Sequence, residues 1–530
     1  NGTISVEMDM IGGLKKTTSR FAIAAAASVL ATSAMAADLG GNCCADLEER
    51  VAELEATAAR KGNRKVSLTV YGQINEGVLW WDDGIESNAY IVTNENSRSR
   101  FGFRGDARIN SEWSAGYLLE IGVRIANSAA VNQYVDDNTS STASLDLRHS
   151  AWYIESNRLG RVWVGHTSMA TDGITEINLS NAGSFANNDV NNWGGGMFLR
   201  LKNGPRLAVA SGGALVGLSW NGILSQANAN VGDGDRRNLV RYVSPTFAGF
   251  TFSSSWGEDD FWDVALRYAN EFNGVRVAAG IGYQKWTDGD AQAIVPEPFF
   301  GGGFASVPTG SQGDRGCADL HFVDPDAFPF RSDHDVDCWA LGMSGSIMHV
   351  PTGLYIHGAY GYLKDKNRRE LFALQAFDLG DELLLPNVEE RDEHWYIQGG
   401  VERNFFGIGK TTIYGEYFKA NTGAGLSNGN VRNIGGLFYP AVEGAEETVL
   451  TPFGAITRSE VTMWGLGIVQ SIDAAAMDLY LGYRNYSGNF TAVIVPTEEV
   501  GEEGGYGTPY RAKFNVDNYH AVFAGGIIRF

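Results

Sequence analysis

Residues 519–530 read YHAVFAGGIIRF and end the chain on Phe530. Successive side chains of a β-strand point to opposite sides, so Val522, Ala524, Ile528 and Phe530 would share one face of this segment. A final strand that ends on an aromatic residue suits a closed barrel, in which the last strand pairs with the first. We therefore expect Phe530 to point outward at the rim of such a barrel.

The same two-residue alternation recurs from residue 65 onward. Phe101 and Phe103 fall on one face of the segment 98–104, and Arg98, Arg100 and Arg104 fall on the other. Similar patterns occupy 66–78, 113–125, 263–268 and 477–484. A soluble sandwich with one solvated face would show this alternation too, so the pattern alone does not separate the two architectures.

Strand length and connection length favour a membrane barrel. Several alternating segments reach about 10 residues or more, which is the span of a tilted transmembrane strand, whereas soluble strands average about 5–6. Short turns, for example at 110–111, 273–274 and 472–473, alternate with long loops, as in outer-membrane barrels. Aromatic residues near strand ends, among them Trp81, Trp286, Trp395 and Trp464, suit the girdles of such a barrel.

The predicted fold is therefore all-β: a transmembrane antiparallel up-and-down β-barrel of 16–18 strands over residues 65–530, preceded by a short helix. The lower count applies if 205–211 and 214–221 form one excursion inside a loop. Beyond residues 21–30, no apolar run approaches the roughly 18 residues that suggest a membrane helix.

Composition and motifs argue against other function classes. The net charge of −21 makes nucleic acid an unsuitable partner, because phosphate binding needs a basic surface. The eight His residues are scattered, and the chain contains no H-E-x-x-H, G-x-S-x-G or P-loop motif. We therefore predict no enzymatic activity, no cofactor and no bound metal.

The N-terminal 36 residues are predicted to be a leader and signal peptide. A basic stretch at 15–20 precedes an apolar stretch at 21–30, and Ala-Met-Ala at 34–36 suits cleavage. A short buried helix is the alternative interpretation.

Residues 37–64 are predicted to be a periplasmic segment with a short amphipathic helix. Leu47, Val51, Leu54 and Ala58 are spaced 4, 3 and 4 residues apart, as on one seam of a coiled coil. Two heptads make only a marginal helix. The segment is thus a solvated linker, a trimeric bundle beneath the barrel, or a contact with the cell wall.

Four cysteines are present. Cys317 and Cys338 bracket a long loop and could form a disulfide in an oxidising compartment, although free thiols are the alternative. Cys43 and Cys44 are adjacent and would pair between subunits or stay unpaired.

Several stretches resemble the trimeric porins of alphaproteobacterial outer membranes. They are DLGGNCCADLEERVAELEATAAR (38–60), KVSLTVYGQ (65–73), RFGFRG (100–105), GRVWVGH (160–166), SPTFAGFTF (244–252), DVALRY (263–268) and the terminal Phe530. The resemblance implies a water-filled channel of the outer membrane, usually a homotrimer, that passes small hydrophilic solutes and ions passively. It also implies an inward-folded third long loop, here 168–204, and a role for Phe530 as an assembly signal. Expected partners are outer-membrane lipid and lipopolysaccharide, with peptidoglycan as a contact of the helix.

A diffusion pore needs a constriction whose width and charges set its selectivity. The expected basic wall, its neighbouring carboxylates and the opposing acids of the loop are Arg98, Arg100, Arg104, Arg124, Arg148, Glu120, Asp146, Asp172, Glu176 and Asp189. Alternatively, the arginines lie above the membrane or pair with Glu120 and Asp146 to brace the barrel, and the loop acids only confer solubility.

Three functions compete at this point. The leading one is a general diffusion porin, with weak selectivity and a slight preference for cations, because the acidic loop 287–336 opposes the arginines. A structural barrel that anchors the envelope to the cell wall is the second, and a substrate-specific channel is the third.

Overall fold

The computed structural model describes most of the segment that follows residue 64. The described residues are 65–136, 145–211, 214–224, 231–257, 261–287, 294–296, 304–306, 338–366, 389–423, 453–495, 497–498, 505–506 and 510–530. The predicted leader, the predicted amphipathic helix, Cys43, Cys44 and Cys317 lie outside them.

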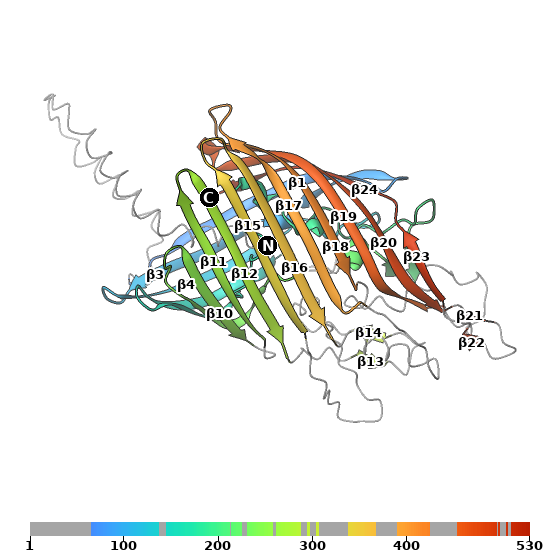
Figure 1. The fold of residues 1–530 in the computed structure, drawn as a ribbon, viewed down its shortest axis with the longest axis horizontal. Coiled ribbons are helices and arrows are strands. Elements are labelled where there is room, and N and C mark those ends of the chain that lie inside the picture. The colour runs from blue at the N-terminus through green and yellow to red at the C-terminus, as the bar shows by residue number, and fades with distance from the viewer. Residues whose placement is uncertain are drawn as a thin grey trace, which may run out of the picture.

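Sixteen antiparallel strands form a closed ring (Figure 1). In ring order they are β1 (Thr69–Asp82), β3 (Arg100–Arg108), β4 (Trp113–Val123), β5 (Leu145–Ser156), β6 (Gly160–Ser168), β9 (Arg236–Val243), β10 (Phe250–Gly257), β11 (Trp262–Phe272), β12 (Val275–Trp286), β15 (Cys338–His349), β16 (Leu354–Asp365), β17 (Arg391–Arg403), β18 (Thr411–Thr422), β19 (Phe453–Ile472), β20 (Met477–Val495) and β24 (Tyr519–Arg529). The ring closes because β24 pairs with both β20 and β1. The predicted barrel is confirmed.

The sheet has eighteen strands because two more extend strands of the ring. β2 (Ser87–Thr93) pairs with the C-terminal part of β1, and β23 (Tyr510–Asn515) pairs with the C-terminal part of β20. The stretch predicted as either a strand pair or a loop excursion is the latter: β7 (Ala208–Ser211) and β8 (Ala214–Gly217) pair only with each other. The lower of the two predicted counts therefore describes the ring.

The chain end closes the barrel through backbone hydrogen bonds. The Gly72 amide donates to the Phe530 carbonyl at 2.9 Å, and the Phe530 amide donates to the Gly72 carbonyl at 3.0 Å. The Phe530 side chain is 66% exposed and points outward, as predicted. Its ring covers Gly72, where a Cβ atom would lie 2.6 Å from the ring. Gly72 therefore provides the room that the terminal ring needs.

The exposed fraction of successive side chains alternates along the strands. One face of each strand can therefore contact lipid, and the other face contacts the interior of the barrel. In β16, β17 and β18 the outward residues, such as Ile356, Ile397 and Ile413, are exposed and their neighbours buried. Trp395 and Trp464 are outward, as expected for a girdle. The same prediction was wrong for Trp81 and Trp286, which are buried because their parity turns them inward. Among the described residues, no helix is long and apolar enough to span a membrane.

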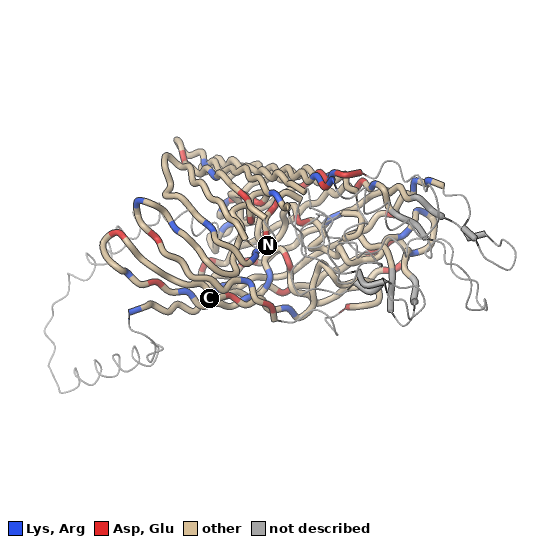
Figure 2. Tube along the Cα trace, turned by 90° about the horizontal axis from the view of Figure 1, so that it is seen from below, with Lys and Arg blue, Asp and Glu red and all other residues tan. Residues whose placement is uncertain are grey.

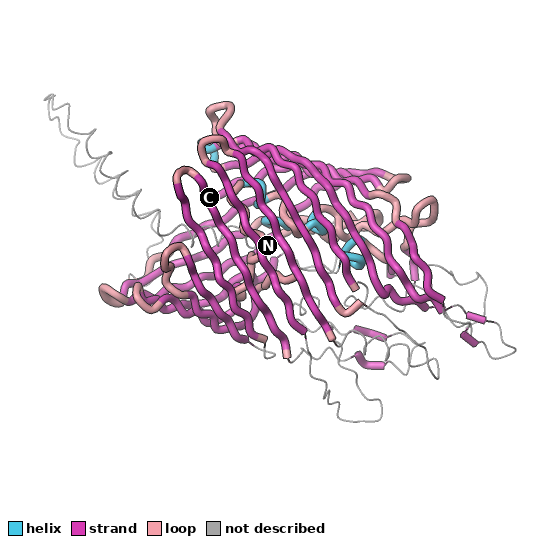
Figure 3. Tube along the Cα trace, viewed as in Figure 1, coloured by secondary structure: helices cyan, strands magenta, loops and turns pink. Residues whose placement is uncertain are grey.

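Residues 169–235, which connect β6 to β9, fold into the barrel; 212–213 and 225–230 of this connection are not described. We call this connection the inner loop. It carries η2 (Asn181–Ser184), η3 (Val190–Asn192) and α4 (Trp220–Leu224). Figure 3 shows these short helical turns within the ring of strands. The inner loop is thus the element that can narrow the lumen.

Candidate functional site

The inner loop is fastened along one inner wall of the barrel. Thr171 Oγ1 donates to Asp263 Oδ2 of β11 at 2.7 Å, and Ser344 Oγ of β15 donates to the Ile174 carbonyl at 2.6 Å. Further along, Asn181 Nδ2 donates to Ser471 Oγ of β19 at 2.9 Å. These contacts follow successive strands around the ring, so the loop covers the inner face of the wall from β10 to β20.

A buried ion pair lies where the loop meets β18 and β20. Arg484 Nε is 2.7 Å from Glu416 Oε1, and the two side chains are 0% and 1% exposed. Arg484 Nη2 also donates to the Asn187 carbonyl of the loop at 3.0 Å, and the Tyr396 hydroxyl donates to Glu416 Oε2 at 2.6 Å. The guanidinium therefore links the wall to the loop. We call Glu416 and Arg484 the loop-anchor pair.

Trp193 packs on this pair and fixes the middle of the inner loop against the wall. The Arg484 Cζ atom lies 4.4 Å from its ring centroid, a cation–π arrangement. The Trp193 ring meets Phe523 of β24 edge-on at 5.5 Å, and the Tyr519 hydroxyl donates to the Trp193 carbonyl at 3.2 Å. Trp193 is fully buried by these neighbours.

A second charged centre lies on another part of the wall, around Glu120 of β4. Arg148 Nε of β5 is 2.7 Å from Glu120 Oε1, and Arg100 Nε of β3 is 3.7 Å from Glu120 Oε2. The Tyr71 hydroxyl of β1 donates to Glu120 Oε2 at 2.9 Å. One carboxylate thus joins side chains from four consecutive strands of the ring.

Two further ion-pair groups extend this centre. Arg98 pairs with Asp146 and lies 3.8 Å from Glu95, which also pairs with Arg124 at 2.7 Å. Glu95 belongs to η1 (Glu95–Ser97), between β2 and β3.

The last group connects to the inner loop. Arg236 at the start of β9 lies 3.6 Å from Asp172 and 3.7 Å from Asp235. We call the whole set the arginine–carboxylate cluster: Glu95, Arg98, Arg100, Glu120, Arg124, Asp146, Arg148, Asp172, Asp235 and Arg236. It contains five arginines and five carboxylates and is formally neutral. Figure 2 likewise shows acidic and basic positions interspersed rather than gathered on separate walls.

A barrel wall with a charged centre and an inward loop is the architecture of a channel, and the family comparison agrees. The family model described as Gram-negative porin matches residues 22–498. The chain belongs to this family. It is therefore an outer-membrane, non-enzymatic channel for passive diffusion.

Solved structures similar to the porin include other bacterial channels. An anion-selective porin from Comamonas acidovorans is 14% identical, with a TM-score of 0.45, over 88% of this chain and 100% of that one. OmpT of Vibrio cholerae is 11% identical, with a TM-score of 0.43, over 89% of this chain and 100% of the other. Salmonella typhi OmpF, in complex with daunomycin, is 10% identical, with a TM-score of 0.42, over 89% and 99%. No curated protein matches the porin.

The structure brings together most of the arginines and carboxylates expected from the sequence. Arg98, Arg100 and Arg148 are buried in the cluster, in the pairing with Glu120 and Asp146 that was the alternative interpretation. Arg104 lies apart from these pairs: it is exposed, with its guanidinium 5.1 Å from the centre of the Tyr71 ring.

The acids expected on the inner loop do not form one exposed row. Asp172 pairs with Arg236, and Glu176 accepts a hydrogen bond from Asn187 Nδ2 at 2.9 Å. Burial raises the pKa of Glu176 well above its ordinary value, and the Asp189 carboxylate nearby raises it further. Asp189 is itself buried. Glu176 therefore holds its negative charge less readily than an exposed carboxylate does.

Sequence reasoning missed Glu95, Arg236, Asp235 and the loop-anchor pair. Glu416 lies at an inward position of β18 between Tyr414 and Phe418. A carboxylate between two inward aromatic residues was the signal that could have identified it, because such a group needs a buried partner. No signal along the chain indicated Glu95, since its position depends on the bend between β2 and β3.

Cys338 at the start of β15 is buried and disulfide-bonded. Its predicted partner Cys317 lies outside the described residues, so the pairing of these two stays a prediction. Among the described residues, no group of His, Cys, Asp or Glu side chains could hold a metal ion.

Proposed function

We propose that solutes cross the porin between the inner loop and the inner wall formed by β3–β6 and β9, with the constriction at the arginine–carboxylate cluster. The difference in exposure between the two walls supports this path. Inward residues of β4 and β6, such as Leu118 and Arg161, keep part of their surface exposed. The inward residues of β16, such as His357 and Leu363, are buried against the interior. Open space therefore adjoins this wall on the short-turn side of the cluster, whereas cluster residues such as Glu120 and Arg148 are themselves buried.

The single observation that carries this proposal is the pairing of every arginine of the cluster with a carboxylate. Opposite charges a few ångströms apart largely cancel each other's field at longer range, so the constriction discriminates ions weakly. The acidic excess of the whole chain, −21, then leaves a slight preference for cations. The solutes are small and hydrophilic and pass without saturable binding.

Planar-bilayer recordings of the purified porin test this. Wild type should give a small reversal potential of cationic sign in a salt gradient. Glu120→Gln removes the carboxylate shared by Arg100 and Arg148, so its reversal potential should move toward anions at nearly unchanged conductance.

The matched control is Glu271→Gln, which breaks an exposed pair with Arg276 (2.8 Å) at the short-turn rim. It should leave the reversal potential unchanged. A wild-type channel with strong anion preference, or equal effects of the two substitutions, would contradict the proposed constriction.

We further propose that the porin belongs to the alphaproteobacterial subgroup and forms a homotrimer. The sequence stretches at 38–60 and 65–73 support the subgroup and, with it, the trimer. We retain Phe530 as the proposed assembly signal, and its outward position at the closing seam leaves it accessible. Native mass measurement of the detergent-extracted porin should give three copies, and a monomer would overturn the assignment.

A further inference from the structure

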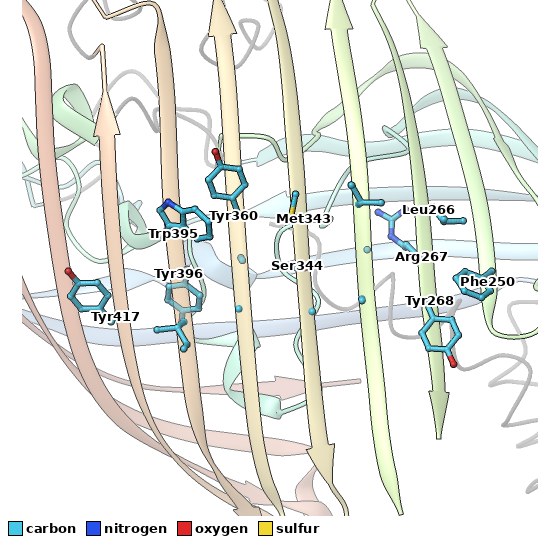
Figure 4. A pocket seen from close by; sticks show the side chains of 17 residues that line it. Phe250, Leu266, Arg267, Tyr268, Met343, Ser344, Tyr360, Trp395, Tyr396 and Tyr417 are labelled. Atoms are coloured by element: carbon cyan, nitrogen blue, oxygen red, sulfur yellow. The ribbon is translucent and has the colours of Figure 1, made fainter. Parts of the chain in front are cut away.

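An apolar groove lies on the outer face of the barrel, away from the lumen. It has a volume of about 760 Å³ and runs across β10–β18. Figure 4 shows Tyr360, Trp395 and Tyr417 at one side and Leu266, Tyr268 and Phe250 at the other. Trp395, Tyr417 and Phe250 are each about half exposed. The groove is therefore open to whatever surrounds the barrel.

Small residues form the floor of the groove. Ala279, Gly345 and Gly358 stand side by side in the strand register of β12, β15 and β16. A Cβ atom on Gly345 or Gly358 would meet no other atom closer than 3.5 Å or 3.7 Å, and neither glycine has a positive φ. Neither packing within the chain nor backbone conformation requires glycine here. The effect of the two glycines is to deepen the groove between its aromatic sides.

Three lysines lie on the long-loop side of the groove, on the same outer wall. Lys285 and Lys364 flank Trp339 in one register row, and Lys419 is opposite Trp395 in the register of β17 and β18. The three lysines make no hydrogen bond or ion pair with any described residue. In the part of the chain that the structure describes, the outward positions of β1 and β3–β6 hold neither lysine nor arginine. The outward lysines of the groove wall therefore have no counterpart on the wall of β1 and β3–β6.

The spacing between lysines and groove matches one membrane leaflet. Lys285 lies six residues from Ala279, and Lys364 six residues from Gly358, so the two rows are about 20 Å apart along the strands. At the usual strand tilt this is about 14 Å of depth, close to half of a hydrocarbon core of about 30 Å. The lysines thus reach headgroup level when the groove lies near mid-membrane.

We propose that this wall is a binding site for a phosphorylated, multiply acylated lipid of the outer leaflet, of the lipopolysaccharide type. Lys285 and Lys364 would bind its phosphates, and one acyl chain would occupy the groove. The lysines lie toward the long loops, which face the cell exterior in such barrels, and this places the site in the outer leaflet.

Charge also argues for a lipid rather than a second copy of the chain. A neighbouring copy would have to meet the lysines with carboxylates. The one carboxylate at an outward position in the middle of β1, Glu76, already accepts hydrogen bonds from Thr93 and Ser99 at 2.9 Å and 2.7 Å. The lysines have no comparable partner there, whereas lipid phosphates supply one. This inference needs the orientation of the barrel but not the proposed constriction.

The test measures retention of purified lipid A by the full-length porin in detergent, using native mass spectrometry with bisphosphorylated and dephosphorylated lipid A. Wild type should retain the bisphosphorylated form preferentially. Each of Lys285→Gln and Lys364→Gln should weaken it about fivefold, since a basic residue near a membrane surface contributes about 1 kcal/mol. Gly358→Leu should fill the groove and weaken both forms.

Two matched variants control for general effects. Arg403→Gln removes an exposed cation from the opposite, short-turn end of β17, and Ala115→Leu enlarges an outward small residue on β4. Neither should change lipid retention, and single-channel conductance should stay at the wild-type value in all variants, showing that they fold. Equal retention of the two lipid forms, or unchanged retention in the lysine variants, would overturn the site. Cross-linking between copies through Gly358→Cys would assign the groove to a subunit contact instead.

Discussion

Two charged centres inside this barrel have the same chemistry but different surroundings. Glu120 on β4 and Glu416 on β18 each accept an arginine at 2.7 Å and a tyrosine hydroxyl. The pair at Glu416 is sealed by the inner loop and by Trp193, and the Glu416 side chain is 1% exposed. The Glu120 side chain is 8% exposed and lies on the wall along which we propose the solute path. The difference teaches that the course of the loop, rather than the residue types, separates a structural ion pair from one beside the proposed solute path.

The largest expected effect comes from breaking the sealed pair. Glu416→Ala leaves Arg484 charged and buried without its partner, which should lower the free energy of unfolding by about 3–5 kcal/mol. Denaturant titration of the porin in lipid vesicles measures this. The double variant Glu416→Leu with Arg484→Met removes both charges and should recover most of the loss, because a buried pair is often replaceable by apolar residues. Equal loss in the single and double variants would contradict the role of the uncompensated charge.

A somewhat smaller effect is expected when the loop loses its aromatic anchor. Trp193→Ala removes the contacts with Phe523 and Arg484 and should lower the free energy of unfolding by about 3 kcal/mol. Because this part of the loop is then free to move, single-channel conductance should rise and its noise increase. Trp152→Ala, an exposed outward residue on β5, is the control and should leave conductance unchanged. Wild-type conductance in Trp193→Ala would show that this contact does not hold the constriction.

At the open wall the expected change is in selectivity. Arg98→Gln leaves Asp146 and Glu95 with less positive charge nearby, so the cation-to-anion permeability ratio should rise by about 1.5- to 5-fold. This is the opposite sign to Glu120→Gln, and reversal potentials in a salt gradient distinguish the two. If both variants moved the ratio in one direction, the cluster would not act through its charges.

The smallest effect concerns a charged contact at the outer end of the loop. Arg206 lies 2.6 Å from Asp83, between β1 and β2. Burial alone would raise the pKa of Asp83, but hydrogen bonds from the backbone amides of Glu86 and Ile85 and from Arg206 lower it below its ordinary value. A lowered pKa stabilises the folded state above the unfolded pKa of about 3.9, and this stabilisation is lost as pH falls through the folded pKa.

Acidification below about pH 4 should therefore loosen this end of the loop. Closure frequency in bilayer recordings between pH 6 and pH 3 measures the effect. Asp83→Asn should already show at neutral pH the behaviour that wild type shows only in acid. A wild-type response identical to that of Asp83→Asn at every pH would remove Asp83 from the explanation.

Much of the architecture could be predicted because alternation is a local property. A strand between lipid and interior must change polarity every second residue, so Arg98–Arg104 and 519–530 were assigned to the correct faces from their letters alone. Parity also explains the errors at Trp81 and Trp286. They lie near strand ends, as girdle residues do, but on the inward face. The position of a residue along its own strand is easier to infer from sequence than the alignment of that strand's ends with the ends of its neighbours.

The chain alone determined that this is a barrel, which faces of its strands are polar, and that arginines of β3 and β5 point inward, since period and charge are properties of neighbouring residues. Only the tertiary structure decided what those arginines meet. Arg100 and Arg148 share the carboxylate of Glu120. Glu95 reaches Arg124 from the bend after β2, and Arg236 at the start of β9 pairs with Asp172 of the inner loop. Such contacts depend on strand register and loop path, which are set by packing across the whole ring.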